Sequence, residues 1–150
     1  MGINVIYYPF KELNQLNVLE RMNPVTKNAV FPKRFPIFMS TFKLYSLQEE
    51  IELIQGLNKS TGKNIGIYPE IKEPAFHRKE GMDISNIVLK ILKDYGYKTK
   101  NDSCILQCFD ADELKRIRNE FKNELFLVQL MEFKKEEEKL IVILRSKIIN

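Results

Sequence analysis

The chain has 150 residues, of which 44% are hydrophobic and 29% are charged. These values are typical of a soluble globular protein, and the length suits a single domain with a substantial core. The net charge of +4 is mildly basic, but basic and acidic residues are interspersed, which argues against a nucleic-acid-binding surface. No apolar run is long enough for a membrane span.

The two cysteines, Cys104 and Cys108, lie four residues apart, with no histidine or further cysteine at metal-binding spacing. We therefore expect small buried hydrophobes of a strand rather than a disulfide or a metal site. Residues 1–8 lack the charged start and the long apolar stretch of a secretory signal, so a cytoplasmic location is expected for the chain as written.

The first part of the chain shows little regular patterning. Residues 3–8 predict a short strand, and residues 11–19 predict a short helix that its asparagines weaken. Residues 24–42 combine three prolines with four phenylalanines and several basic residues, which indicates an ordered insertion loop. Its aromatic side chains are expected to dock the loop on the body, and binding of an anionic ligand is the alternative.

From Ser46 onward, helix and strand patterns alternate. A capping box at residues 46–49 opens a helix that ends near residues 56–58, and residues 64–72 predict a short strand with Glu70 and Lys72 at its end. Asp83 caps a second helix that Gly96 ends, residues 103–109 form a buried strand, and a capping box at residues 110–113 opens a third helix. Residues 125–131 form a last strand, whereas residues 74–81 are expected to be a loop. The alternation predicts an α/β fold with a parallel sheet.

The tail, residues 133–150, begins with a charge run and continues with the apolar residues 140–144. Periodicity does not decide whether these five residues form a strand or the inner stripe of a helix.

Residues 64–72 (Asn-Ile-Gly-Ile-Tyr-Pro-Glu-Ile-Lys) carry the clearest chemical signal. Glu70 and Lys72 are two apart, so an extended backbone directs both side chains to one face. A carboxylate can bind a divalent cation and an ammonium can bind phosphate, although an ordinary surface ion pair explains the same spacing. Gln107 and Asp110 also follow strand patterns, and ligand sites of parallel sheets lie at the carboxyl ends of strands.

Three segments carry a resemblance to a known family. Residues 66–72, the pattern Pro74-x-Phe76-His77, and residues 106–115 (Leu-Gln-Cys-Phe-Asp-Ala-Asp-Glu-Leu-Lys) closely resemble the glycerophosphodiester phosphodiesterases of the periplasmic bacterial type. The Arg34-Phe35-Pro36 turn and residues 49–57 are similar to the same family. The resemblance covers roughly residues 8–132.

The resemblance implies a (β/α)8 TIM barrel that hydrolyses glycerophosphodiesters to glycerol 3-phosphate and an alcohol. It implies that Glu70 is a ligand of a divalent cation, calcium or magnesium, and that Lys72 and Gln107 bind the small-molecule substrate. His77 matches a loop position of the family and not a catalytic one. Members of the family are periplasmic or surface lipoproteins.

The chain also departs from the family pattern. The family uses two histidines as acid and base, in H-R-G and H-D motifs, and takes further metal ligands from its second strand. This chain has one histidine, His77, and neither motif. Because such a barrel needs about 250 residues, we expect a single incomplete domain, residues 1–150, that contains only the central βα units and ends in a divergent tail.

Three functional hypotheses remain open. The first is an enzyme fragment without catalytic residues of its own, inactive alone, which a separate chain completes by supplying the missing strands. The second is a non-catalytic truncated remnant or binding module. The third is a different metal-dependent hydrolase that uses His77 with Glu70 and Glu80. A lone carboxylate is expected to bind a divalent cation weakly.

Overall fold

The computed structural model describes residues 5–34, 37, 39–134 and 139–144. The chain divides into two compact units, residues 1–46 and residues 47–150. No helix among the described residues is long and apolar enough to cross a membrane.

The first unit contains little regular structure. It has a 3-10 helix η1 (Val5–Tyr7), one turn of helix α1 (Phe10–Leu13), and an isolated antiparallel bridge between Met22 and Ala29. The strand predicted at residues 3–8 is therefore wrong for residues 5–7, while residues 3 and 4 lie outside the described part. The predicted helix at residues 11–19 is shorter than expected, because Asn14 and Asn17 are poor helix formers.

An ion pair holds the loop of the first unit. Glu20 is 4% exposed and accepts two hydrogen bonds from Arg34, at 2.8 Å from Nε and at 2.7 Å from Nη2. The Arg34 guanidinium also lies 4.6 Å from the ring centre of Phe31. Arg34 and Phe31 belong to the predicted insertion loop, residues 24–42, of which residues 35, 36 and 38 lie outside the description.

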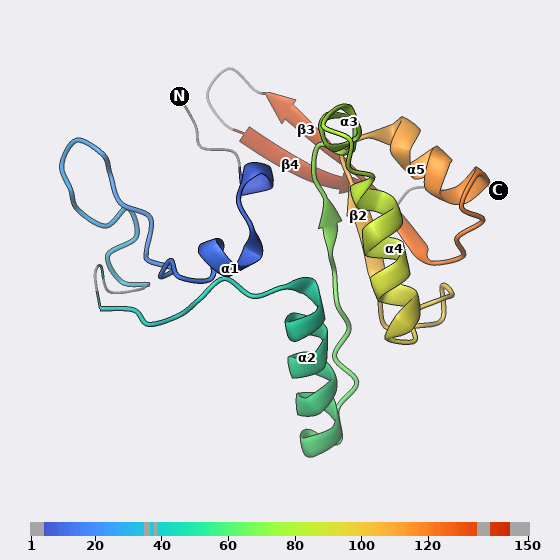
Figure 1. The fold of residues 1–150 in the computed structure, drawn as a ribbon, viewed down its shortest axis with the longest axis horizontal. Helices are drawn as coiled ribbons and strands as arrows, with labels where there is room; N and C mark the ends of the chain where they lie inside the picture. The colour runs from blue at the N-terminus through green and yellow to red at the C-terminus, as the bar shows by residue number, and fades with distance from the viewer. Residues whose placement is uncertain (1–4, 35–36, 38, 135–138, 145–150) are drawn as a thin grey trace. The chain divides into compact units, whose positions relative to one another are not determined.

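The second unit is an α/β structure built on a four-stranded sheet (Figure 1). Its elements are α2 (Leu47–Thr61), β1 (Glu70–Ile71), α3 (Pro74–Lys79), α4 (Ile84–Asp94), β2 (Ile105–Cys108), α5 (Ala111–Asn119), β3 (Phe126–Lys134) and β4 (Lys139–Leu144). The strand order is β1-β2-β3-β4; β1, β2 and β3 are parallel, and β4 is antiparallel to β3. The parallel sheet predicted from the alternation is confirmed, and the apolar part of the tail is a strand.

Strand β1 is short in the assigned structure, but its pairing with β2 begins earlier. Ile67 forms a parallel bridge with Cys104, and Pro69 accepts a hydrogen bond from the Gln107 amide at 3.0 Å. Gly66 allows this close approach, since a Cβ at that position would lie 2.8 Å from the Ser103 carbonyl oxygen. Of the strand predicted at residues 64–72, only Glu70 and Ile71 form regular strand, and Ile67 and Pro69 pair with β2 ahead of it.

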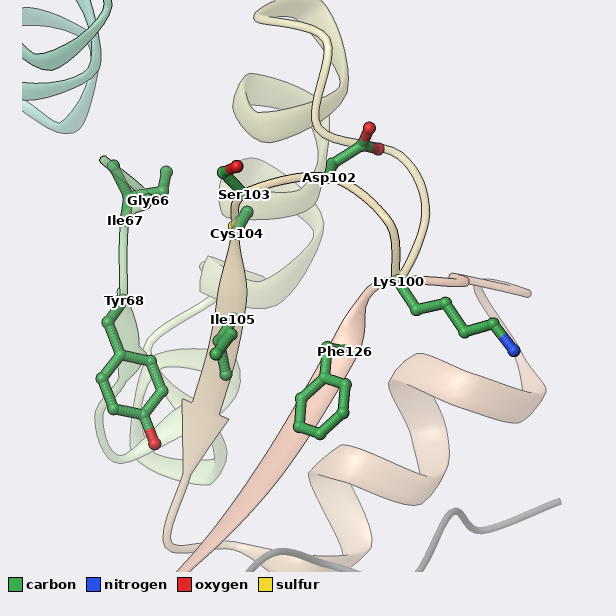
Figure 2. Close-up of a pocket in the computed structure, with 9 residues that line it drawn as sticks. All are labelled: Gly66, Ile67, Tyr68, Lys100, Asp102, Ser103, Cys104, Ile105 and Phe126. Atoms are coloured by element: carbon green, nitrogen blue, oxygen red, sulfur yellow. The ribbon is translucent and has the colours of Figure 1, made fainter. Parts of the chain in front are cut away.

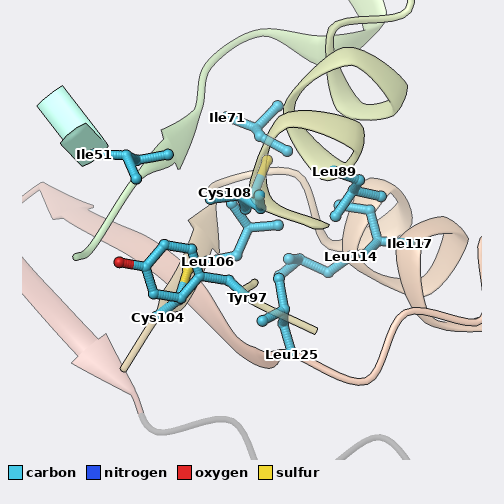
Figure 3. Packing of buried hydrophobic residues seen from close by; sticks show 11 residues of the cluster. Ile51, Ile71, Leu89, Tyr97, Cys104, Leu106, Cys108, Leu114, Ile117 and Leu125 are labelled. Carbon is cyan, nitrogen blue, oxygen red and sulfur yellow. The ribbon is translucent and has the colours of Figure 1, made fainter. Parts of the chain in front are cut away.

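The main core lies between the sheet and its helices (Figure 3). Along β2 the exposure alternates: Leu106 and Cys108 are buried, whereas Ile105 and Gln107 lie on the other face and remain partly accessible. The cluster on the helix side consists of Ile51, Ile71, Leu89, Leu92, Tyr97, Cys104, Leu106, Cys108, Leu114, Ile117 and Leu125. Full burial of each large aliphatic side chain contributes roughly 1.5–3 kcal/mol, so this side carries most of the stability.

Both cysteines are buried, free thiols on the helix side, as the sequence predicts. Burial raises the pKa of Cys104 to about 12 and also raises the pKa of Cys108. The thiols therefore stay protonated and act as small hydrophobic groups.

Local capping residues set the helix ends. Asp83 accepts a hydrogen bond from the Asn86 amide, and Asp110 accepts from the amides of Asp112 and Glu113. Gly96 follows α4 with φ of +94°, a conformation that favours glycine. The predicted starts of α4 and α5 and the end of α4 are confirmed.

Two sequence predictions about helices are wrong. Residues 74–79, expected to be a loop, form α3, because Pro74 occupies the first helical position, where its missing N–H is not needed. Helix α2 continues to Thr61 instead of ending near residues 56–58, since a single Gly56 inside a helix costs only about 1 kcal/mol.

The capping box at residues 110–113 is only half formed. Asp110 acts as the cap, but the Glu113 carboxylate binds Arg78 and Arg116 instead of reaching back to the Asp110 amide. Glu113 is 1% exposed, and two guanidinium groups compensate the cost of burying its charge.

Candidate functional site

Glu70 and Lys72 lie together at the carboxyl edge of the parallel sheet. Glu70 Oε2 is 3.8 Å from Lys72 Nζ, and the exposed fractions of the two side chains are 22% and 75%. The two-residue spacing does bring the acid and the base to one face. Glu70 is mostly covered and Lys72 is mostly exposed, so solvent screens the ammonium and the pair contributes little to folding.

Gln107 is the neighbour of Glu70 on the adjacent strand. The two residues are register partners between β1 and β2, and Val128 of β3 continues the same row. The Gln107 side chain donates a hydrogen bond from Nε2 to the Tyr68 carbonyl at 3.3 Å. This bond fixes the amide beside Glu70 at the sheet edge, where its oxygen can serve as a further polar group.

Asp110, which the sequence also places at a strand end, has a structural role. Its Oδ1 accepts hydrogen bonds from the amides of Asp112 and Glu113, at 3.0 and 3.1 Å. Its own amide donates to the Cys108 thiol at 3.3 Å. Asp110 therefore starts α5 and holds the turn that follows β2.

Gln129 is a polar residue of this edge that sequence reasoning missed. Its Nε2 donates hydrogen bonds to the Phe109 carbonyl at 2.7 Å and to the Leu130 carbonyl at 3.0 Å. It pairs with Cys108 in register and so belongs to the row next to that of Gln107. The sequence signal that could have identified it is its position as the single polar residue within the apolar run of residues 125–131. Gln129 supports the loop after β2 at this edge.

His77 is held inside α3. Its Nδ1 lies 3.0 Å from the Glu73 carbonyl oxygen, and its ring meets Phe76 edge-on at 5.6 Å between centroids. Across the described residues, the structure contains no group of three or more His, Cys, Asp or Glu side chains that could hold a metal ion. The combination of His77 with Glu70 and Glu80 is therefore not assembled in the described part of the chain.

A charged network behind the edge joins the three helices α3, α4 and α5. Arg78 binds Glu113, while Arg116 binds both Glu113 at 2.9 Å and Asp83 at 3.2 Å. Hydrogen bonding from Arg116 lowers the pKa of Asp83, and hydrogen bonding to Asp83 raises the pKa of Arg116 further. The network ties the helices that follow β1 and β2 to one another.

A divalent cation would find only part of a site among these residues. Glu70 offers one carboxylate and Gln107 one amide oxygen, whereas calcium takes six to eight oxygen ligands and magnesium six in near-octahedral geometry. The residues present do not make a complete site. Further ligands would have to come from groups other than these.

A separate hollow of about 480 Å³ lies toward the amino ends of the strands (Figure 2). Tyr68, Ile105 and Phe126 form its apolar wall, and Figure 2 shows the rings of Tyr68 and Phe126 on either side of Ile105. Gly66, Ile67, Lys100, Asp102, Ser103 and Cys104 complete the lining. Ile105 is two residues before Gln107 on β2, so the hollow lies on the same face of the sheet as the candidate site.

Comparison with known proteins gives a consistent result. Residues 5–143 match the model of the glycerophosphoryl diester phosphodiesterase family. A glycerophosphodiester phosphodiesterase of Haemophilus influenzae is 47% identical over 137 residues, which cover 86% of this chain and 37% of that protein. One from Treponema pallidum is 42% identical over 118 residues, covering 77% of this chain and 33% of that protein. The chain spans about a third of the length of these relatives.

Proposed function

Because the chain belongs to the glycerophosphoryl diester phosphodiesterase family, we propose that it supplies part of a site for metal-dependent hydrolysis of glycerophosphodiesters to glycerol 3-phosphate and an alcohol. Glu70 is one ligand of a divalent cation, calcium or magnesium, and Lys72 and Gln107 contact the phosphodiester. The observation that carries the proposal is the placement of Glu70, Lys72 and Gln107 together at the carboxyl edge of a parallel sheet.

Each residue has a simple chemical task in this proposal. The largely exposed Lys72 ammonium offers a point charge to a phosphate oxygen. The bond from Gln107 to the Tyr68 carbonyl keeps its amide beside Glu70 without using its acceptor oxygen. A bound cation would polarise the phosphoryl group as a Lewis acid. It would need ligands beyond those described here, so no step of the reaction is routed through it.

The proposal includes inactivity of this chain alone. Its single histidine, His77, lies in α3 against the Glu73 carbonyl oxygen. Proton transfer between two imidazoles therefore has no residues here to perform it. The same observation favours the second candidate function, a non-catalytic module that binds a phosphate ester through Glu70, Lys72 and Gln107.

Binding and hydrolysis test the proposal separately. We would titrate the 15N-labelled chain with calcium chloride, then with glycerol 3-phosphate, and follow the amide signals of Tyr68 and of residues 70–73. We expect weak cation binding, with a Kd on the order of 1 mM or above, that Glu70→Gln removes. Lys72→Met should weaken binding of the phosphate ester and leave the cation response in place.

Matched controls are available on exposed helix positions. Glu50→Gln on α2 and Lys90→Met on α4 make the same chemical changes far along the chain from the proposed site. Equal responses of Glu70→Gln and Glu50→Gln would contradict a cation site at Glu70. In the hydrolysis assay, turnover of glycerophosphocholine that Glu70→Ala abolishes would contradict the proposed inactivity of the chain. The proposed binding role of Glu70 would still stand.

A further inference from the structure

The connection between β1 and α3 contains a backbone conformation that its residue types disfavour. Glu73 has φ of +45° and ψ of +50°, in the left-handed region, which residues with a side chain rarely adopt. Pro74 follows it, and a proline restricts the residue before it to extended conformations. Lys27 and Lys122, the other described non-glycine residues with positive φ, are each followed by an asparagine. Contacts around Glu73 must therefore outweigh two separate steric preferences.

The pairing of β1 with β2 does not supply these contacts. The register of the two strands ends where Ile71 lies opposite Cys108, so Lys72 and Glu73 lie beyond it. Pro74 is buried at the start of α3. Only two residues connect the buried end of the strand with the buried proline. Their backbone conformation therefore sets the direction in which the chain leaves β1.

His77 supplies the contacts that hold Glu73. The His77 amide donates to the Glu73 carbonyl oxygen at 3.2 Å, and the ring Nδ1 lies 3.0 Å from the same oxygen. Because a carbonyl oxygen only accepts hydrogen bonds, Nδ1 carries a proton. The direction of this carbonyl is set by ψ of Glu73. Two donors from one residue therefore hold ψ near +50° and away from the extended values that a following proline favours.

The His77 ring is itself held in place. It meets the Phe76 ring edge-on, with 5.6 Å between the centroids. The His77 carbonyl accepts a hydrogen bond from the Met82 amide at 2.8 Å, which fixes the backbone that carries the ring. His77 is the single histidine of the chain, and the proposed function gives it no task. Its contacts indicate a task in the turn that follows Lys72.

We propose that His77 is a positioning residue, whose ring holds Glu73 in the left-handed conformation and thereby fixes the preceding residue, Lys72. In this arrangement the Lys72 ammonium lies 3.8 Å from the Glu70 carboxylate. Glu70 is paired in register with Gln107, so its backbone is held by the sheet and not by His77. His77 therefore acts on phosphate binding by Lys72 and leaves cation binding by Glu70 unchanged. The part that concerns phosphate binding rests on the proposed function.

Nuclear magnetic resonance of the unsubstituted chain tests the contact directly. Long-range 1H–15N correlations of the His77 ring at about pH 8.5, where an imidazole is ordinarily neutral, distinguish its two tautomers. We expect the tautomer with the proton on Nδ1. We also expect the HN–Hα coupling and the Cα and Cβ chemical shifts of Glu73 to indicate a left-handed backbone. A ring protonated at Nε2, or an extended Glu73, would overturn the proposal.

Substitutions of His77 test its effect on binding. His77→Phe removes the donor and keeps an aromatic ring beside Phe76. We expect it to weaken binding of glycerol 3-phosphate about fivefold, the effect of one hydrogen bond, and to change the calcium response at Glu70 by less than about twofold. His77→Asn places a side-chain amide donor near the position of Nδ1 and should keep the affinity. Equal weakening by both variants, or none by His77→Phe, would contradict the positioning role.

Substitutions of Glu73 separate its backbone from its carboxylate. Glycine adopts the left-handed region without steric cost, whereas alanine does not. In the His77→Phe background, Glu73→Gly should restore most of the affinity for glycerol 3-phosphate. Glu73→Ala removes the same carboxylate and should not restore it. Equal restoration by both variants would assign the effect to the carboxylate and overturn the proposal.

Failure of the proposed function is read separately. If Lys72→Met leaves binding of glycerol 3-phosphate unchanged, Lys72 has no phosphate role and the proposed function fails at that residue. The contact of His77 with Glu73 is then decided by the coupling and chemical shifts of Glu73 in His77→Phe. A change toward extended values supports the contact, and unchanged values overturn it. The tautomer and the coupling of the unsubstituted chain decide the matter even where a variant does not fold.

Discussion

The two faces of the sheet in residues 47–144 differ in what covers them. Leu106 and Cys108 on one face are buried under helices that this chain supplies itself. On the other face, Tyr68 and Ile105 are more than a third exposed. The helix-covered face is built from local signals in the sequence, namely caps and helical spacing. The open face carries the candidate site and the hollow. It is open along β1 and β2 only, because Val128 of β3 lies in the same row as Gln107 and is 3% exposed.

The largest difference in the loss of stability is expected between substitutions of two neighbouring residues of β2. Leu106→Ala removes a fully buried side chain from the helix-covered face and should lower the free energy of unfolding by about 2–5 kcal/mol. Ile105→Ala, on the open face, should lower it by less than about 1 kcal/mol, because much of that side chain is already accessible. Urea unfolding measures both. Equal losses would show that the open face is covered in solution.

The charge buried among the helices should have the next largest effect. Glu113→Gln leaves Arg78 and Arg116 without their shared carboxylate and should cost about 3 kcal/mol. The matched control is Glu120→Gln, whose 70% exposed side chain lies 3.3 Å from Arg116 and should cost less than about 1 kcal/mol. A negligible cost for Glu113→Gln would mean that the network does not hold the helices together.

The ion pair between Asp83 and Arg116 should also make the free energy of unfolding depend on pH in the acid range. Hydrogen bonding from Arg116 lowers the pKa of Asp83 in the folded state, so the folded protein holds this carboxyl ionised more strongly than the unfolded chain does. The contribution is therefore present above the ordinary pKa of an aspartate, about 3.9, and is lost as the pH falls through the lowered value.

Denaturant unfolding between pH 7 and pH 2.5 tests this dependence. Asp83→Asn should flatten the acid end of the stability profile. The control is Asp112→Asn, since Lys115 lowers the pKa of Asp112 but its side chain is 89% exposed and screened by solvent. Equal flattening by both substitutions would argue against a special role of the Asp83–Arg116 pair.

The sequence predicted most of the helix-covered face, for reasons that individual residues make clear. Asp83, Asp110 and Gly96 act within a few residues of themselves, so their patterns suffice to locate helix ends. Pro74 was misinterpreted as a loop residue because proline both breaks a helix and begins one, and only the surrounding structure decides. The destination of the Glu113 carboxylate depends on Arg78, 35 residues away, and no local pattern contains it.

The sequence also predicted part of the candidate site, namely the placement of Glu70 and Lys72, but not its tertiary contacts. The spacing of Glu70 and Lys72 placed them on one face, and the structure brings them to 3.8 Å. The register between Glu70 and Gln107 follows from the pairing of two strands 37 residues apart, which the sequence suggests only through the alternation of helices and strands. Gln129 was missed because its hydrogen bonds to the Phe109 and Leu130 carbonyls arise from tertiary packing.

The smallest expected effect concerns the site itself and separates function from stability. Glu70→Gln should change the free energy of unfolding by less than about 1 kcal/mol, because its only described ion pair is with Lys72, which is 75% exposed. The loss of stability expected for Leu106→Ala on the helix-covered face is several times larger. A large loss of stability in Glu70→Gln, measured by urea unfolding, would make Glu70 a structural residue. A small loss together with a lost cation response would place its role in ligand binding, on the face that the chain leaves open.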